Sequence, residues 1–177
     1  MPPKPVSTVN PPAFYGDVNM RGHNAVLLLD GIEGFSQYCE KGIDIISFSF
    51  GIGSEQGSSN KGGGAGSSRV SFEGVVIRKS IDKATPLLFK AVADRSPIAN
   101  VGIFLYRDAP EGGKNSEHFF TISLGDVYVA HQKLVDPEGN EAGGIPYEEV
   151  TLIANSIEHN HIKAKKVANI MLTQGAH

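Results

Sequence analysis

The stretch "IDIISFSFGIGSEQGSSNKGGGAGSSRVSFEGVVIRKS", residues 43–80, places two strand-like runs on either side of a tract of glycine and serine. Between residues 46 and 52, bulky apolar side chains alternate with serine and glycine, so the bulky groups share one face of a strand. Ile43 and Ile45 belong to the opposite phase, which predicts a β-bulge at Ile45–Ile46. The second run, residues 69–80, is also typical of a strand.

The tract between these runs is too long for a hairpin turn, because loops beyond about 12–15 residues are usually functional or disordered. It does not match a phosphate-binding loop, since Lys61 is followed by Gly62 and a strand pattern begins again at Val70. Two interpretations remain. The tract is either a flexible loop, or an arm that becomes ordered on a neighbouring subunit, where burial offsets the lost entropy.

One helix is predicted after the second strand, within "DKATPLLFKAVADRS", residues 82–96. Thr85 is the expected N-cap and Pro86 the first helical residue, where the missing N–H costs nothing. Ser96–Pro97 is expected to end the helix. One stripe at helical spacing comprises Leu88, Ala91, Val92 and Arg95.

The rest of the chain is dominated by strand patterns, at residues 25–30, 101–107, 119–124, 126–131 and 149–157. With one helix among so many strands, the sequence predicts a mainly β fold, an antiparallel sandwich or barrel. We expect residues 1–23 to be a flexible, proline-rich extension and residues 24–177 a single domain. Within that domain, the tail of residues 158–177 has no definite assignment, and its part 163–177 is compatible with a short amphipathic helix, a strand or an unpaired extension.

Composition excludes several classes of function. A formal charge of −3 and a pI near 6.1 give no basic surface for nucleic acid. Cys39 is the only cysteine, which rules out an intrachain disulfide and a thiolate metal cluster. No apolar run approaches the roughly 20 residues of a membrane helix, and we expect neither membrane insertion nor a secretory signal peptide.

No group of residues predicts catalysis. His159 and His161 are two apart without a third ligand at metal-binding spacing, and His118 and His131 stand alone, so packed or solvated histidines are expected. Cys39 has no partner that the sequence can place, and no G-x-S-x-G motif is present. We therefore expect no catalytic residue, no metal and no cofactor.

The carboxylates predict no site either. Glu148–Glu149, Glu138 and Glu141 lie in or beside turn segments and are expected to be solvated. Three aspartates lie in separate elements, and the sequence does not show whether any of them meets another charged group: Asp30, Asp44 and Asp82.

Four segments resemble, in order and spacing, the haemolysin-coregulated protein family (Hcp) of bacterial type VI secretion. They are "DGIEG" (30–34), "IDIISFSFGI" (43–52), "VIRKSIDKATPLL" (76–88) and "FFTISLGDVYVA" (119–130). Phe48 and Phe50 stand where the family often has aromatic residues, and Thr85 replaces a usual serine. The resemblance covers residues 25–157, and the end of the chain lacks the family's aromatic W-x-Y strand.

The resemblance implies a small β-barrel with one flanking helix that assembles into a hexameric ring, with rings stacked into a tube that is ejected from the cell. It implies cytoplasmic assembly followed by secretion, with the chain itself, the spike, the sheath and effector proteins as partners. The glycine and serine tract would be an arm that reaches the adjacent subunit or ring. Expected interface residues are Gly51, Ile52, Gly53, Gly62, Gly63, Gly64, Gly66 and Ser67.

Two alternatives stay open beside a purely mechanical tube subunit. One is an effector-binding carrier or chaperone ring, or a secreted effector-like protein; in the carrier ring, Ser47 and Ser49 would face the lumen and contact cargo. The other is an enzyme with its site in "HNHIKAKK", residues 159–166, although fewer than 25 residues beyond the barrel are too few for a separate domain.

Overall fold

The computed structural model of the chain describes residues 23–55, 69–108, 116–138 and 144–172. Its elements in chain order are β1 (His23–Leu29), β2 (Ile43–Glu55), β3 (Arg69–Ser80), α1 (Thr85–Asp94), β4 (Ile98–Asp108), β5 (Ser116–Val135), β6 (Tyr147–Ile153), β7 (Ser156–His161) and β8 (Lys166–Met171). Every strand pairing is antiparallel.

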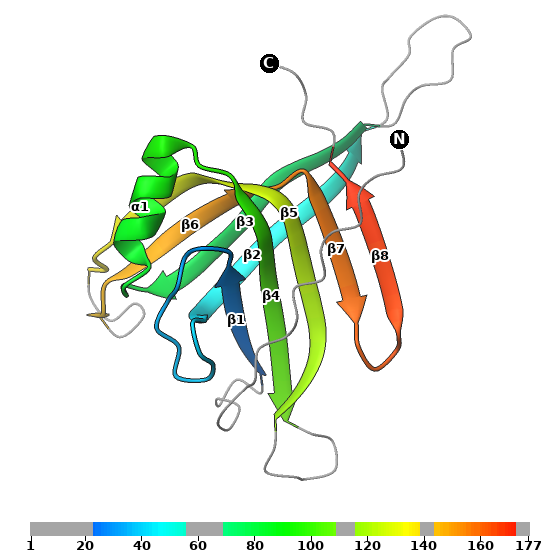
Figure 1. Ribbon diagram of the computed structural model, residues 1–177, viewed down its shortest axis with the longest axis horizontal. Coiled ribbons are helices and arrows are strands. Elements are labelled where there is room, and N and C mark those ends of the chain that lie inside the picture. Colours follow the sequence, from blue (N-terminus) through cyan, green and yellow to red (C-terminus); the bar gives the residue numbers. More distant parts are fainter. Residues whose placement is uncertain (1–22, 56–68, 109–115, 139–143, 173–177) are drawn as a thin grey trace, which may run out of the picture.

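Six strands close a barrel (Figure 1). In the order β4, β1, β2, β3, β6, β5, each strand pairs with the next, and pairing between β4 and β5 completes the circle. Closure satisfies backbone N–H and C=O groups that an open sheet would leave at its edges. The fold is therefore the mainly β barrel with one helix that the sequence predicts.

Strand β5, at 20 residues, belongs to two parts of the molecule. Residues 128–135 pair with β6 as part of the barrel sheet. Residues 120–125 pair with β7, and β7 in turn pairs with β8. The β7–β8 hairpin thus stands beside the barrel as an extension of its wall (Figure 1).

Strands β2 and β3 also extend beyond the barrel. β2 pairs with β1 only over residues 43–45, and β3 pairs with β6 only over residues 75–80. Residues 47–55 of β2 pair only with β3, and residues 69–72 of β3 pair only with β2, with a register shift between Phe50 and Ile52. We call these two segments the β2–β3 ribbon.

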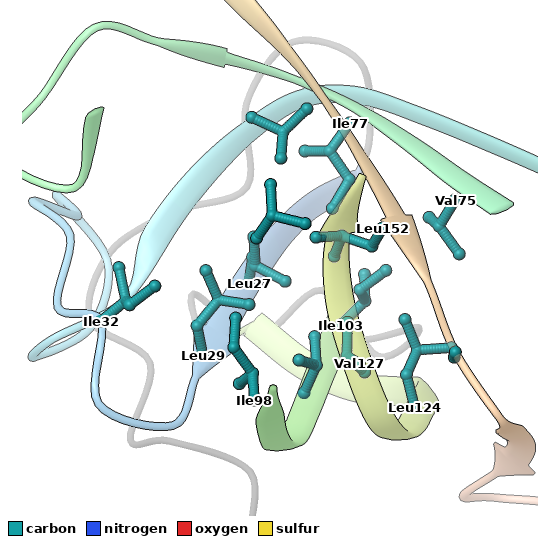
Figure 2. Close-up of a cluster of buried hydrophobic side chains, with 14 of the residues drawn as sticks. Leu27, Leu29, Ile32, Val75, Ile77, Ile98, Ile103, Leu124, Val127 and Leu152 are labelled. Atoms are coloured by element: carbon teal, nitrogen blue, oxygen red, sulfur yellow. The ribbon is translucent and has the colours of Figure 1, made fainter. Parts of the chain in front are cut away.

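The barrel interior is filled by aliphatic side chains from all six of its strands, and Figure 2 shows part of this core. Leu27, Ile77, Ile103, Leu124 and Leu152 are all at most 2% exposed. Burial of each such side chain contributes about 1.5–3 kcal/mol, so this core is the main source of stability. Helix α1 packs against it through Leu88 and Ala91, both buried.

A second, smaller apolar cluster lies apart from the main core and contains Val26, Cys39, Phe104 and Tyr106. Cys39 comes from the connection between β1 and β2, which packs here against strand residues of β1 and β4. The packing is tight at Gly42, where an added Cβ would lie 2.2 Å from Cys39 Sγ. Burial raises the pKa of the Cys39 thiol.

Several predictions of local structure are confirmed. The strand over residues 69–80 has the predicted bounds, and the bulge appears as a register shift between Ile45 and Ser47. The tail of residues 158–177 contains the end of β7 and the whole of β8. Among the three interpretations of residues 163–177, the strand is correct over Lys166–Met171.

Other predictions are wrong in detail. Thr85 is the first helical residue, and the N-cap position is taken by Ala84. Residues 119–131 form one continuous strand, because Asp126 adopts a φ of 51° and the chain continues where Gly125–Asp126 suggested a break. The strand predicted over 149–157 is divided between β6 and β7. His23, assigned to the flexible extension, begins β1, and residues 1–22 lie outside the described part.

Candidate functional site

A buried ion pair joins strands β3 and β6 at the barrel end where α1 begins. The side chain of Lys79 is 1% exposed and that of Glu148 is fully buried. The Lys79 ammonium donates to Glu148 Oε1, to Asp82 Oδ1 at 2.8 Å and to the carbonyl oxygen of Ser80 at 2.7 Å. All three ammonium protons therefore have acceptors, which offsets the cost of burying the charge.

The same carboxylate holds the start of the helix. Thr85 Oγ1 donates to Glu148 Oε1 at 2.7 Å, and Gln132 Nε2 donates to Glu148 Oε2 and to the backbone oxygen of Thr85. Asp82 accepts from the backbone N–H groups of Ala84 at 2.9 Å and Phe35 at 3.1 Å. This network fixes α1 to β3, β5, β6 and the β1–β2 connection.

Three members of this network, Lys79, Asp82 and Thr85, come from the segment of residues 76–88. The network is therefore the structural role of the polar residues in that segment. It also corrects the expectation that Glu148 is solvated. Glu148 alternates inward with Val150, whereas Glu149 points to the outer face and pairs with Arg78 at 2.9 Å. Glu138 is exposed as predicted, and Glu141 lies outside the described residues.

The predicted interface residues fall on the β2–β3 ribbon and beyond it. Gly51, Ile52 and Gly53 lie on β2 and are exposed. An added Cβ at Gly51 would meet nothing within 4 Å, so space alone does not explain that glycine. The remaining expected interface residues, Gly62, Gly63, Gly64, Gly66 and Ser67, lie outside the described part of the chain.

Ser47 and Ser49 are exposed on the face of β2 opposite Phe48 and Phe50. Their partners across the sheet are Arg78 and Val76 on β3. The face that carries the two serines is thus a surface of small and polar groups that continues across three strands, through Arg78 to Glu149 on β6.

Among the strand edges without a partner in the described residues are those of β8 and β2. β8 pairs with β7 on one side only, and β2 pairs with β3 alone from Ser47 onward. Both edges carry exposed apolar side chains. These are Ile52 on β2 and Val167, Ile170 and Met171 on β8.

The histidines are packed or exposed side chains and bring no ligands together. His118 contacts the rings of Phe104 and Tyr106, and its Nε2 lies 2.8 Å from Thr121 Oγ1. His159 contacts two phenylalanines, and its Nε2 is buried without a hydrogen-bond partner. Burial lowers the pKa of both His118 and His159.

An open cleft of about 740 Å³ lies between the end of β1 and the start of α1. Leu28 and Leu87 contribute apolar walls, and Glu33 at its rim pairs with Lys41 at 3.2 Å and with Lys83 at 3.8 Å. The glutamate raises the pKa of Lys41. Glu33 thus balances the charge of the two lysines, and the residues that line the cleft include no nucleophile beside a general base.

Within the described residues, no three histidine, cysteine or acidic side chains come together as they would around a metal ion. No helix in the same ranges has the length and apolar character needed to cross a membrane.

A protein-family model described as "Type VI secretion system effector, Hcp" matches residues 26–161. The comparison with curated proteins finds no match.

Solved structures with the same fold include a type VI secretion system effector from Yersinia pestis, at 21% identity and a TM-score of 0.64, covering 84% of this chain and 99% of that one. The secreted protein Hcp3 from Pseudomonas aeruginosa is 18% identical, with a TM-score of 0.64, and covers 86% of this chain and 99% of that one. Hcp1 from Salmonella typhimurium is 18% identical, with a TM-score of 0.63 and coverage of 84% and 92%.

Proposed function

The chain belongs to the Hcp family of type VI secretion, whose members are structural secretion proteins, and from this premise we propose that it is a subunit of the inner tube of the secretion system. Six copies join into a ring, rings stack into a tube, and the tube is ejected with the spike when the sheath contracts. The tube assembles in the cytoplasm and its subunits leave the cell through the secretion machine.

The observation that carries this proposal is that strand edges on both β2 and β8 are left uncovered by the barrel. A closed head-to-tail ring needs two different contact surfaces on each subunit. The edge of the β2–β3 ribbon and the outer edge of β8 are two such surfaces, each with exposed apolar side chains. Pairing with neighbouring copies would satisfy their backbone groups and bury those side chains.

The glycine and serine tract supports the same proposal. It connects the end of β2 to the start of β3 in the chain. We assign it the role of an arm toward the adjacent subunit or ring, with Gly51, Ile52 and Gly53 at its base.

A second role, as a carrier of effectors, is favoured by the surface around Ser47 and Ser49. The row that continues from Ser47 carries Arg78, Glu149 and Lys133, and the row from Ser49 carries Val76, Thr151 and His131. Such a surface suits reversible contact with cargo in a ring lumen, because it offers hydrogen-bonding groups and charges of both signs.

Size-exclusion chromatography with light scattering tests the assembly. We expect a species of about six times the chain mass of 18.9 kDa, and ring-shaped particles in electron micrographs. A strictly monomeric protein at the highest attainable concentration would contradict the proposal. The carrier role is tested by co-expression with an effector, which should be lost when ring formation is prevented.

A further inference from the structure

We propose that the β7–β8 hairpin is attached to the β2–β3 ribbon by an acid-sensitive contact centred on the His159 ring, so that mild acid releases the hairpin. β7 pairs along its backbone with β5 and β8, and no backbone pairing links it to β2. Side chains therefore make the connection between the hairpin and the ribbon.

The His159 ring is the centre of this connection. It lies 5.3 Å from the ring of Phe50 on β2 and 5.5 Å from that of Phe120 on β5, both at steep angles. Its Nε2 is buried and has no hydrogen-bond partner. An uncharged imidazole fits this apolar contact, whereas a protonated one would bury an N–H⁺ group without an acceptor.

The surrounding groups offer no compensating negative charge. Alternation and register place Phe50 of β2, Ile122 of β5 and Ala168 of β8 toward His159. The titratable groups on the same face are His161, two residues along β7, and Lys166, which is paired with His161 across the hairpin. Neither side chain can carry a negative charge. Burial lowers the pKa of His159, in agreement with this arrangement.

Carboxylates near the hairpin point elsewhere. Glu158 alternates to the opposite face of β7, where it accepts from Asn169 on β8 at 3.5 Å. Among the described residues, no acidic side chain shares the face of β2, β5, β7 or β8 that meets His159. Protonation therefore adds charge to a site that offers it no partner, which weakens the side-chain contact between the hairpin and the ribbon.

The consequence for assembly rests on the proposed function. β8 carries one of the uncovered strand edges, so a hairpin that shifts away from the ribbon displaces a ring contact. A tube stable at neutral pH would come apart in an acidic compartment and release its cargo there.

Amide hydrogen exchange measured on the intact protein tests the contact directly. Between pH 7.5 and pH 5.5, after correction for intrinsic rates, we expect opening of residues 156–161 and 166–171 to increase at least tenfold relative to residues 101–105 in β4. In the wild-type protein, an NMR titration of the His159 imidazole should have the same midpoint as this change.

Three variants test whether His159 causes the pH dependence of hairpin opening. His159→Phe keeps an aromatic ring and should abolish the pH dependence, whereas His161→Asn and the exposed His131→Gln should retain it. An equal acid response in His159→Phe, or none in the wild type, would overturn the inference. Slower exchange in acid would do so too, because it would mean that the phenylalanine rings attract the imidazolium.

Light scattering at the two pH values separates this inference from the proposed function. Rings at pH 7.5 that dissociate at pH 5.5, and fail to do so in His159→Phe, support both. A protein that is monomeric at pH 7.5 contradicts the ring alone, and the exchange measurement still decides whether His159 controls the hairpin.

Discussion

Lys79 and Glu148, separated by 68 intervening residues, form an ion pair that is almost completely buried between β3 and β6. Through Thr85 and Gln132 the same pair determines where α1 begins. A buried pair of this kind contributes little net stability compared with apolar residues, but losing one partner leaves the other charge uncompensated.

Removing one partner should therefore be costly. We expect Lys79→Met to lower the free energy of unfolding by about 3–5 kcal/mol, and Lys79→Met combined with Glu148→Leu to lower it by less than the sum of the two single changes. Denaturant titration followed by circular dichroism measures both. The exposed pair Lys90–Asp94 provides the control, since Lys90→Met should change stability by less than about 1 kcal/mol. Equal losses at Lys79 and Lys90 would contradict this account.

Gly74 should not tolerate a side chain. Its φ is +98°, and an added Cβ would lie 2.7 Å from Ile153 Cδ1 and 2.9 Å from the backbone oxygen of Leu152. We expect Gly74→Ala to destabilise the fold by about 1–3 kcal/mol, because it combines backbone strain with a contact to the facing strand. Thermal unfolding compares it with Gly51→Ala, where the Cβ meets open space. A Gly74→Ala protein as stable as the Gly51→Ala protein would refute the prediction.

His118 predicts a loss of stability in mild acid. Its pKa is lowered in the folded protein by burial against Phe104 and Tyr106, so the folded state binds fewer protons than the unfolded chain. The free energy of unfolding should be highest above the unfolded pKa of about 6.5 and fall as the pH drops toward the folded pKa, by about 1.4 kcal/mol for each unit of depression.

Denaturant titrations at pH 7.5, 6.5 and 5.5 measure this effect. His118→Phe should lose less stability than the wild type over that interval, whereas His131→Gln, on the exposed part of β5, should behave as the wild type does. The interpretation fails if His118→Phe and the wild type have parallel pH profiles.

A charge on the outer edge of β8 should prevent assembly without unfolding the subunit. Val167 is 59% exposed, so Val167→Lys costs little in the isolated chain but places a charge where the proposed neighbour would lie. We expect a folded monomer by circular dichroism and light scattering. Lys163→Gln, in the turn between β7 and β8, is the matched surface control and should leave the rings intact. Rings that persist in Val167→Lys would exclude this edge from the interface.

The sequence predicts those elements whose signal is local. The alternation of residues 46–52 with the opposite phase of Ile43 and Ile45 is sufficient for both the strand and its bulge, and Pro86 marks the start of the helix to within one residue. The four segments that resemble Hcp then predict membership of that family, and family membership predicts the barrel.

Features that depend on contacts between residues far apart in the sequence are not predicted. Glu148 stands in a glycine-rich neighbourhood typical of a turn, and only the pairing of β3 with β6 brings it to Lys79. β8 is exposed at each of its six residues, so burial imposes no alternation on its sequence. The division between β6 and β7 is equally hidden, because the chain passes from one position along β5 to another without a strong turn signal.

Closure of the barrel through β4 and β5 has a consequence for the timing of polymerisation. A subunit whose barrel is already closed can fold as a monomer. Growth of a filament can then use folded subunits, and no chain has to complete its folding on a neighbouring subunit. The concentration of folded subunits, more than the folding rate of each chain, would then determine how fast the filament elongates.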